Sequence, residues 1–218
     1  MVSHAVTPPL IGVLALQGAV SEHAAVLATL GARTRTVTRP AHLEGLAGLV
    51  MPGGESTAMA RLGAGVGMFE AIAARHASGT LPLLGTCAGL ILLANEVEDT
   101  EEAEALAGFT RAPALDITAR RNAYGAQRES FLADLALEDA ADPDGAAAGG
   151  AGRRTVRSAF IRAPQIVRVG DGVEILARHA GRPVLVRQGD VLAATFHPEI
   201  TGDTAVHALF LARVRAAD

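Results

Sequence analysis

The chain is poor in aromatic residues, has a single cysteine and lacks any long apolar run. Only 3% of its 218 residues are aromatic while half are hydrophobic, so we expect a core built from Ala, Val, Leu and Ile. One cysteine cannot form an internal disulfide, which is typical of a reducing compartment, and we expect a cytoplasmic protein. No apolar stretch approaches the roughly 20 residues that span a membrane. The length suits one domain over residues 1–218.

The chain also lacks an excess of positive charge. A net charge of −4 and an isoelectric point near 6.0 argue against nucleic acid or an anionic membrane as the main partner. Residues 1–9 have neither the basic start nor the apolar stretch of a signal peptide, so we expect them to form an N-terminal extension. We expect no metal ion and no cofactor.

Short apolar runs alternate with helical patterns in the first half of the chain. Three continuous apolar runs are typical of strands buried on both faces: 10–16, 47–51 and 81–84. Residues 33–38 alternate like an edge strand, and helices are expected over 20–30 and 88–95. The pattern predicts an α/β fold with an open, largely parallel sheet flanked by helices.

The sequence pattern changes after about residue 100. Its short β-like runs predict antiparallel strands added to the parallel sheet or packed beside it: 114–119, 156–161, 165–169, 173–178, 183–188 and 191–196. An Ala-, Gly- and Asp-rich stretch at about 139–155 is predicted to be a flexible surface loop. Residues 201–217 are predicted to form a closing amphipathic helix.

The only cysteine, Cys87, lies between an expected strand and an expected helix. It is the central residue of 85–89, with sequence GTCAG. A glycine on each side leaves room for the sharp turn of a nucleophile elbow, and the N–H groups of the following helix favour thiolate over thiol. A lone cysteine can also be a small buried hydrophobe, but this setting favours a nucleophile.

A thiolate nucleophile needs a base and a group that orients the base. His197 follows the apolar run 191–196 and precedes Pro198 and Glu199. In an extended segment Glu199 would lie on the same side as His197 and accept from one ring nitrogen, leaving the other to face Cys87. These residues therefore predict a Cys-His-Glu triad.

Five other histidines carry no such pattern. His4, His42 and His76, like His23 and His207 on two expected helices, are predicted to be solvated surface residues.

Thiolate attack on a carbonyl carbon creates an oxyanion, which needs preorganised N–H donors. Gly53 and Gly54 follow the strand 47–51, and their backbone is free to turn an N–H towards the site. The amide of Ala88 follows the nucleophile directly. Taken alone, the Pro-Gly-Gly sequence would be interpreted as a tight turn.

Six segments carry a resemblance to a known family. Three resemble the signatures of the triad-type (class I) glutamine amidotransferases: 85–89 (GTCAG), 52–57 (PGGEST) and 196–199 (FHPE). Three more resemble one branch, the glutaminase subunit of pyridoxal 5′-phosphate synthase: 12–20 (GVLALQGAV), 121–125 (RNAYG) and 160–164 (FIRAP). The resemblance runs from about residue 10 to 216 and implies a flavodoxin-like sheet.

The resemblance implies hydrolysis of glutamine to glutamate and ammonia, with Cys87 forming a thioester, His197 shuttling the proton and Glu199 orienting His197. It implies that Gln17 helps to set up the oxyanion site when a partner docks. It implies these substrate contacts: Gly54, Glu55, Ser56, Arg121, Ile161 and Arg162. A guanidinium suits the α-carboxylate of free glutamine.

In the resembled family the ammonia passes to a separate (β/α)₈-barrel synthase subunit, which makes pyridoxal 5′-phosphate, so such a partner is expected here. Other functions stay open from the sequence. They are a glutaminase that serves another acceptor, a cysteine peptidase or esterase, and a non-catalytic scaffold that only binds its partner.

Overall fold

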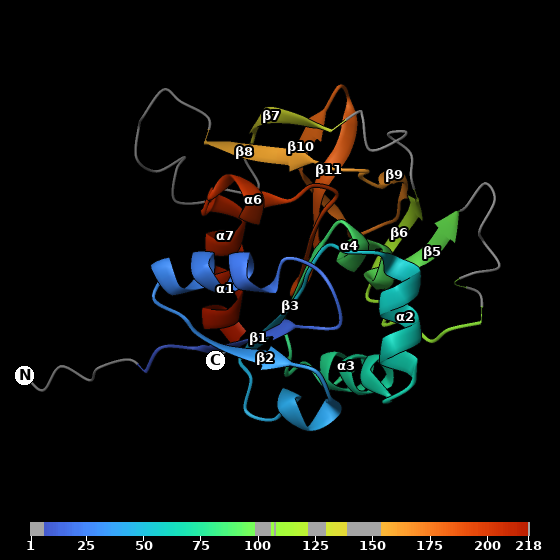
Figure 1. Cartoon of the computed structure of the whole chain (residues 1–218). Helices are drawn as coiled ribbons and strands as arrows, with labels where there is room; N and C mark the ends of the chain where they lie inside the picture. The colour runs from blue at the N-terminus through green and yellow to red at the C-terminus, as the bar shows by residue number, and fades with distance from the viewer. Residues whose placement is uncertain (1–6, 99–105, 107, 122–129, 139–153, 218) are drawn as a thin grey trace, which may run out of the picture.

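A seven-stranded sheet runs through the middle of the molecule (Figure 1). The structure is a computed structural model that describes residues 7–98, 106, 108–121, 130–138 and 154–217. In spatial order the strands are β10 (Glu174–His179), β11 (Arg182–Gln188), β12 (Val191–Ala194), β4 (Leu83–Thr86), β3 (Gly48–Met51), β1 (Leu10–Leu14) and β2 (Arg33–Val37). The pairings from β12 to β2 are parallel, and β10, β11 and β12 pair antiparallel. The predicted largely parallel sheet, with β2 at its edge, is confirmed.

Helices cover both faces of this sheet. On one side lie α2 (Ser56–Ala64), α3 (Met68–Ala77) and α4 (Ala88–Leu93), and on the other lie α1 (Val20–Thr29) and α7 (Ala205–Ala217) (Figure 1). Along β3, Leu49 and Met51 belong to the core on the α2 side, whereas Val50 belongs to the core on the α1 side. Successive strand residues face opposite ways, so a strand covered on both faces must be apolar throughout.

The remaining elements lie beyond the main sheet. They are the 3₁₀ turn η1 (Pro40–Leu43), the short helix α6 (Pro198–Thr201), a sheet of β5 (Ala94–Glu98), β6 (Leu115–Arg120) and β9 (Gln165–Val169), and the pair β7 (Phe131–Ala136) and β8 (Thr155–Phe160). Strands β5 and β7 were not predicted from the sequence. Most of the stretch predicted as a surface loop, 139–153, lies outside the described residues, as do residues 1–6 of the predicted extension.

The helix predicted over 88–95 is shorter than expected. It ends at Leu93, and Ala94 begins β5. The carbonyls of Leu92 and Leu93 accept the backbone N–H groups of Ala112 and Ala114, so they are not available to a longer helix. The run 191–196 is also corrected: β12 pairs antiparallel with β11 but parallel with β4, and is therefore part of the parallel sheet.

Phenylalanines contribute to the described core, contrary to the expectation of a purely aliphatic interior. Four phenylalanines are among the largest fully buried side chains: Phe69, Phe160, Phe196 and Phe210. No helix in the described part of the chain is long and apolar enough to cross a membrane.

The closing helix begins at Ala205 rather than at Thr201, because Gly202 and Asp203 interrupt the helical backbone. Gly202 adopts a left-handed φ of 71° at the end of α6. Asp203 Oδ1 accepts from the N–H of Ala205 at 2.7 Å, and its Oδ2 accepts from the N–H of Arg157 at 2.9 Å. One carboxylate thus joins the start of α7 to strand β8.

Replacing Asp203 by alanine should lower the free energy of unfolding by about 1–2 kcal/mol, because the first turn of α7 loses its acceptor. Asp203→Asn retains one side-chain oxygen and should cost less. Chemical denaturation of the two variants and the wild type measures the difference. Equal losses for Ala and Asn would contradict a capping role.

Candidate active site

Cys87 lies at the turn between β4 and α4 in an unusual backbone conformation. Its φ is 48° and its ψ is −103°, and positive φ is uncommon for residues other than glycine. Its N–H donates to the Ala194 carbonyl at 2.8 Å, and the side chain is buried. Strained residues of this kind persist when their surroundings hold them in place and are concentrated at functional sites.

The two glycines that flank Cys87 are required by close packing. A Cβ atom on Gly89 would lie 2.0 Å from the carbonyl oxygen of Met51 on β3, and one on Gly85 would lie 2.9 Å from the carbonyl carbon of Gly89. Neither glycine has a positive φ. They allow the turn by letting three segments of backbone approach one another.

His197 and Glu199 are in contact, as predicted, but through a different local structure. Nδ1 of His197 lies 2.8 Å from Oε1 of Glu199. The segment is not extended: His197 precedes α6, Pro198 is the first residue of that helix, and Glu199 lies in its first turn. The N–H of His197 donates to the carbonyl of Ala159 at the end of β8, which fixes the backbone on the other side.

His197 is charged at neutral pH. Burial lowers its pKa, but hydrogen bonds and negative charge from Cys87 and Glu199 outweigh burial and raise the pKa to about 10. Burial raises the pKa of Glu199, but the hydrogen bond and the positive charge of His197 bring it below its usual range. The arrangement favours an imidazolium ring in contact with Cys87 and with the Glu199 carboxylate.

His23 and His207 are buried, and their prediction as surface residues is wrong. Both are fully inaccessible to solvent, and Nδ1 of His23 lies 2.8 Å from Nε2 of His207. The sequence did contain a signal: His23 precedes the buried Val26 and Leu27 by three and four residues on α1, which is the spacing of one helix face.

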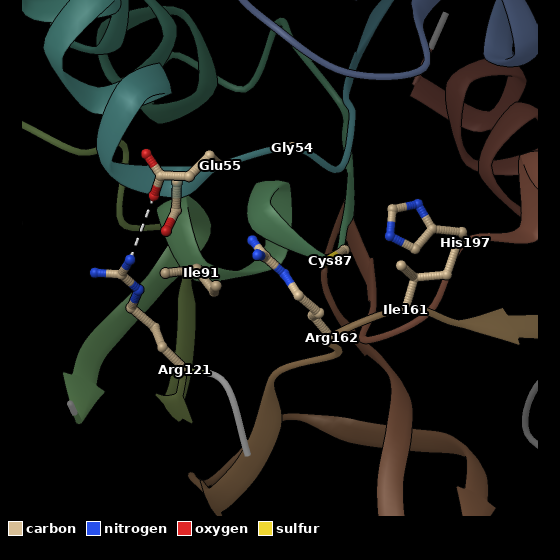
Figure 2. Close-up of a pocket in the computed structure, with 9 residues that line it drawn as sticks. Gly54, Glu55, Cys87, Ile91, Arg121, Ile161, Arg162 and His197 are labelled. Atoms are coloured by element: carbon tan, nitrogen blue, oxygen red, sulfur yellow. Dashed lines mark hydrogen bonds and ion pairs between the residues drawn. The ribbon is translucent and has the colours of Figure 1, made fainter. Parts of the chain in front are cut away.

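A cavity of about 230 Å³ opens beside Cys87 and His197 (Figure 2). Its lining residues are Gly54, Glu55, Ser56, Cys87, Ile91, Arg121, Ile161, Arg162 and His197. All six predicted substrate contacts are thus gathered around one space, although they come from three distant parts of the sequence. Ile91 was not predicted, but it follows Cys87 by four residues on α4 and so faces the same way.

Of the predicted oxyanion residues, Gly54 lines the cavity, whereas Gln17, Gly53 and Ala88 are not among the lining residues. A Cβ atom on Gly53 would be 2.2 Å from Cε1 of His197, and one on Gly18 would be 1.7 Å from the Gly53 carbonyl oxygen. Oε1 of Gln17 accepts from the N–H of Glu55 at 2.8 Å. The loop after β1 is thereby fixed to the loop after β3.

The two arginines of the cavity have different surroundings. Nη2 of Arg121 donates to Thr57 Oγ1 at 3.1 Å and lies 3.4 Å from Oε1 of Glu55. Glu55 in turn accepts from the N–H groups of Thr57 and Ala58 at the start of α2. Arg162 has a φ of 45° and points into the cavity from the end of β8 (Figure 2), and no described carboxylate pairs with it.

Comparison with known proteins identifies the family of the chain. Residues 13–216 match the SNO glutamine amidotransferase family. The chain belongs to the SNO glutamine amidotransferase family. Within the family, it is 48% identical over 208 residues to the pyridoxal 5′-phosphate synthase subunit PdxT of Parafrankia sp. (strain EAN1pec), covering 95% of this chain and 94% of that protein. It is also 48% identical over 208 residues to the PdxT subunit of Mycobacteroides abscessus, covering 95% and 98%.

A solved structure has the same fold as this chain. A crystal structure described as a glutamine amidotransferase superposes with a TM-score of 0.80 at 42% identity, over 94% of this chain and 98% of that one. The class of fold expected from the sequence is confirmed.

The charge on His197 can be tested by replacing Cys87 with alanine. The pKa of His197 should fall in Cys87→Ala, because the hydrogen bond and the charge that Cys87 supplies are lost. NMR titration of the ring between pH 5 and 11 measures the change. An identical titration in both proteins would contradict contact between the two side chains.

The same shift predicts how stability varies with pH. The pKa of His197 is about 10 in the folded protein and 6.5 in the unfolded chain. The contribution of protonated His197 to the free energy of unfolding is therefore complete below pH 6.5 and is lost as the pH rises through 10. The stability advantage of the wild type over Cys87→Ala should therefore shrink across that interval, as thermal unfolding at several pH values would measure.

Proposed function

We propose that this chain is the glutaminase subunit of a pyridoxal 5′-phosphate synthase, hydrolysing L-glutamine through Cys87, His197 and Glu199. The observation that carries the proposal is the placement of His197 between a strained cysteine and a buried carboxylate at the edge of one small cavity. Membership of the SNO family and 48% identity to PdxT subunits support the same reaction.

In the first step the Cys87 thiolate attacks the side-chain amide carbon of glutamine. The carbonyl oxygen becomes an oxyanion, which the amide of Ala88 and an N–H of the Gly53-Gly54 loop would stabilise. The tetrahedral intermediate collapses with cleavage of the C–N bond, and His197 donates its ring proton to the departing ammonia. A thioester on Cys87 results.

In the second step water attacks the thioester carbon. His197 is neutral after the first step, and it removes a proton from the water as the C–O bond forms. Collapse of the second tetrahedral intermediate breaks the C–S bond, releasing glutamate and restoring the thiolate and the imidazolium. Glu199 keeps the ring in one orientation and stabilises its positive charge in both steps.

The cavity fits a small, free amino acid. Its volume of about 230 Å³ is below the roughly 300–1,000 Å³ of pockets that hold drug-sized ligands, which argues against a peptide substrate. Gly54, Glu55, Ser56 and Ile161 would line the bound glutamine. Arg162 is the better placed of the two arginines to pair with the α-carboxylate, because Arg121 is engaged with Thr57 and Glu55.

The ammonia would pass to a synthase subunit with a (β/α)₈ barrel. Gln17 lies on an exposed loop and holds the N–H of Glu55, so a partner that contacts this loop could adjust the backbone of the Gly53-Gly54 segment. Docking would then complete the oxyanion site, and the uncomplexed chain should be weakly active.

The deciding experiment is an assay of glutamate release from glutamine by the purified chain, alone and with its cognate synthase subunit, beside Cys87→Ala. We expect a rate that rises when the synthase subunit is added and no activity in the variant. If the wild type releases no glutamate either alone or with the synthase subunit, the proposed glutaminase activity is overturned. Equal rates with and without the synthase subunit would overturn activation by docking.

Arg162→Gln should raise KM for glutamine by about 10- to 100-fold with a smaller change in kcat. A hydrogen bond to a charged group contributes about 1.5–3 kcal/mol, and the α-carboxylate is distant from the reacting amide. Arg178→Gln is the matched control, because Arg178 pairs with Glu138 outside the cavity. An unchanged KM in Arg162→Gln would exclude Arg162 from substrate binding.

A further inference from the structure

A buried chain of polar side chains extends behind Glu199, away from the substrate cavity. Oε1 of Glu199 accepts from His197, and Oε2 lies 3.4 Å from Nε2 of His23 on α1. His23 then contacts His207 on α7 at 2.8 Å. Helices α1, α6 and α7 lie on the same side of the sheet (Figure 1). Neither His23 nor His207 lines the cavity, and the mechanism above uses neither.

Both rings are neutral at neutral pH. Burial lowers the pKa of His23, with the charge of His197 opposing protonation further, while Glu199 and Glu22 act the other way. Burial also lowers the pKa of His207 to about 3, with His23 adding to the effect. Each ring therefore carries one N–H and one bare nitrogen.

The contacts decide between the two arrangements of those protons. If His23 donated from Nδ1 to His207, its bare Nε2 would face the Glu199 carboxylate, and Nδ1–H of His207 would be a buried donor. Nδ1 of His207 has no hydrogen-bond partner among the described residues. A buried donor without an acceptor is costly, and two electron-rich atoms facing each other repel.

The opposite arrangement has neither fault. Nε2–H of His207 donates to Nδ1 of His23, and Nε2–H of His23 donates to the Thr86 hydroxyl at 3.3 Å. The same nitrogen lies 3.4 Å from Glu199 Oε2, a buried oxygen that accepts no hydrogen bond from the described residues. Nδ1 of His207 is then a bare acceptor. The geometry assigns this tautomer to each ring, and it places an N–H beside each oxygen of Glu199.

We propose that His23 and His207 are positioning residues for the glutaminase reaction proposed above, on which this role rests: they hold the Glu199 carboxylate ionised and in one orientation beneath His197. His23 supplies the N–H that faces Oε2, and His207 fixes the tautomer of His23. Glu199 is thereby held from two sides, by His197 on Oε1 and by His23 on Oε2. Because its side chain is fully inaccessible to solvent, water cannot take the place of His23.

The test compares His23→Leu, which removes both ring nitrogens, with His23→Gln, whose amide can still donate towards Glu199. His76→Leu is the matched control, because His76 is a half-buried histidine on α3 whose ring hydrogen-bonds the Leu81 carbonyl and does not line the cavity. Each variant is assayed as the full chain with the synthase subunit, and thermal unfolding identifies those that fold. His207→Leu and His207→Gln repeat the comparison one residue further from the site.

We expect kcat to fall about 10- to 100-fold in His23→Leu, the range known for groups that orient a metal-bound imidazole, with KM within twofold of the wild type. The acid limb of the kcat profile should move to higher pH, since Glu199 without its second donor binds a proton more readily. His23→Gln should recover most of kcat, and His76→Leu should match the wild type.

A folded His23→Leu with the kcat and pH profile of the wild type would overturn the proposal. Equal losses in His23→Leu and His23→Gln would overturn it as well, because packing rather than the N–H would then be responsible. The rate of Cys87 alkylation by iodoacetamide as a function of pH is measured in parallel and needs no turnover. If the wild type releases no glutamate, the proposed function fails, and the alkylation profiles still decide whether His23 acts on the triad.

Discussion

The hydrogen bond from the Cys87 N–H to the Ala194 carbonyl sets the geometry of the whole site. It continues the parallel pairing of β4 with β12 by one residue beyond Thr86, which is the partner of Ala194 in the sheet. His197 comes three residues after Ala194. The register of two neighbouring strands therefore determines how far the cysteine lies from the histidine, although 110 residues of sequence (197 − 87) separate them.

The charge of Glu199 is balanced within the site that this backbone positions. The buried Glu199 carboxylate is stabilised by a charged ring on one side and faces a neutral ring on the other, so a single negative charge is matched by a single positive one. Removing either neighbour would leave a buried charge short of a partner, which is costly in a low-dielectric interior. The strain at Cys87 and the ionisation of Glu199 thus depend on the same packed interior.

The parts of the fold that follow from local pattern could be predicted from the sequence. The central strands are apolar on both faces, and the turn at Cys87 and the loop at Gly53 lie where such strands end. The contact of Glu199 with His197 was also predicted, but from an extended segment rather than from α6. The local structure was predicted wrongly because Pro198 suits the first position of a helix as well as an extended chain.

Other features depend on contacts that no local pattern specifies. The end of α4 is set by Ala112 and Ala114, which reach it from a distant segment. The burial of His23 was visible in its helical spacing, but its contact with His207 requires α1 and α7 to lie on the same face of the sheet. A general preference of histidine for the surface was therefore a poor guide to these two residues.

The close packing of Gly18 on Gly53 has a consequence for how the sequence can vary. Gly18 is exposed and lies outside the cavity, yet its φ is +100° and a Cβ atom there would overlap the Gly53 carbonyl oxygen. Any other residue would be strained in its own backbone and would also displace the loop that supports His197. Tolerance to substitution in this protein is therefore not a function of depth below the surface, since an exposed glycine is as constrained as the buried residues around Cys87.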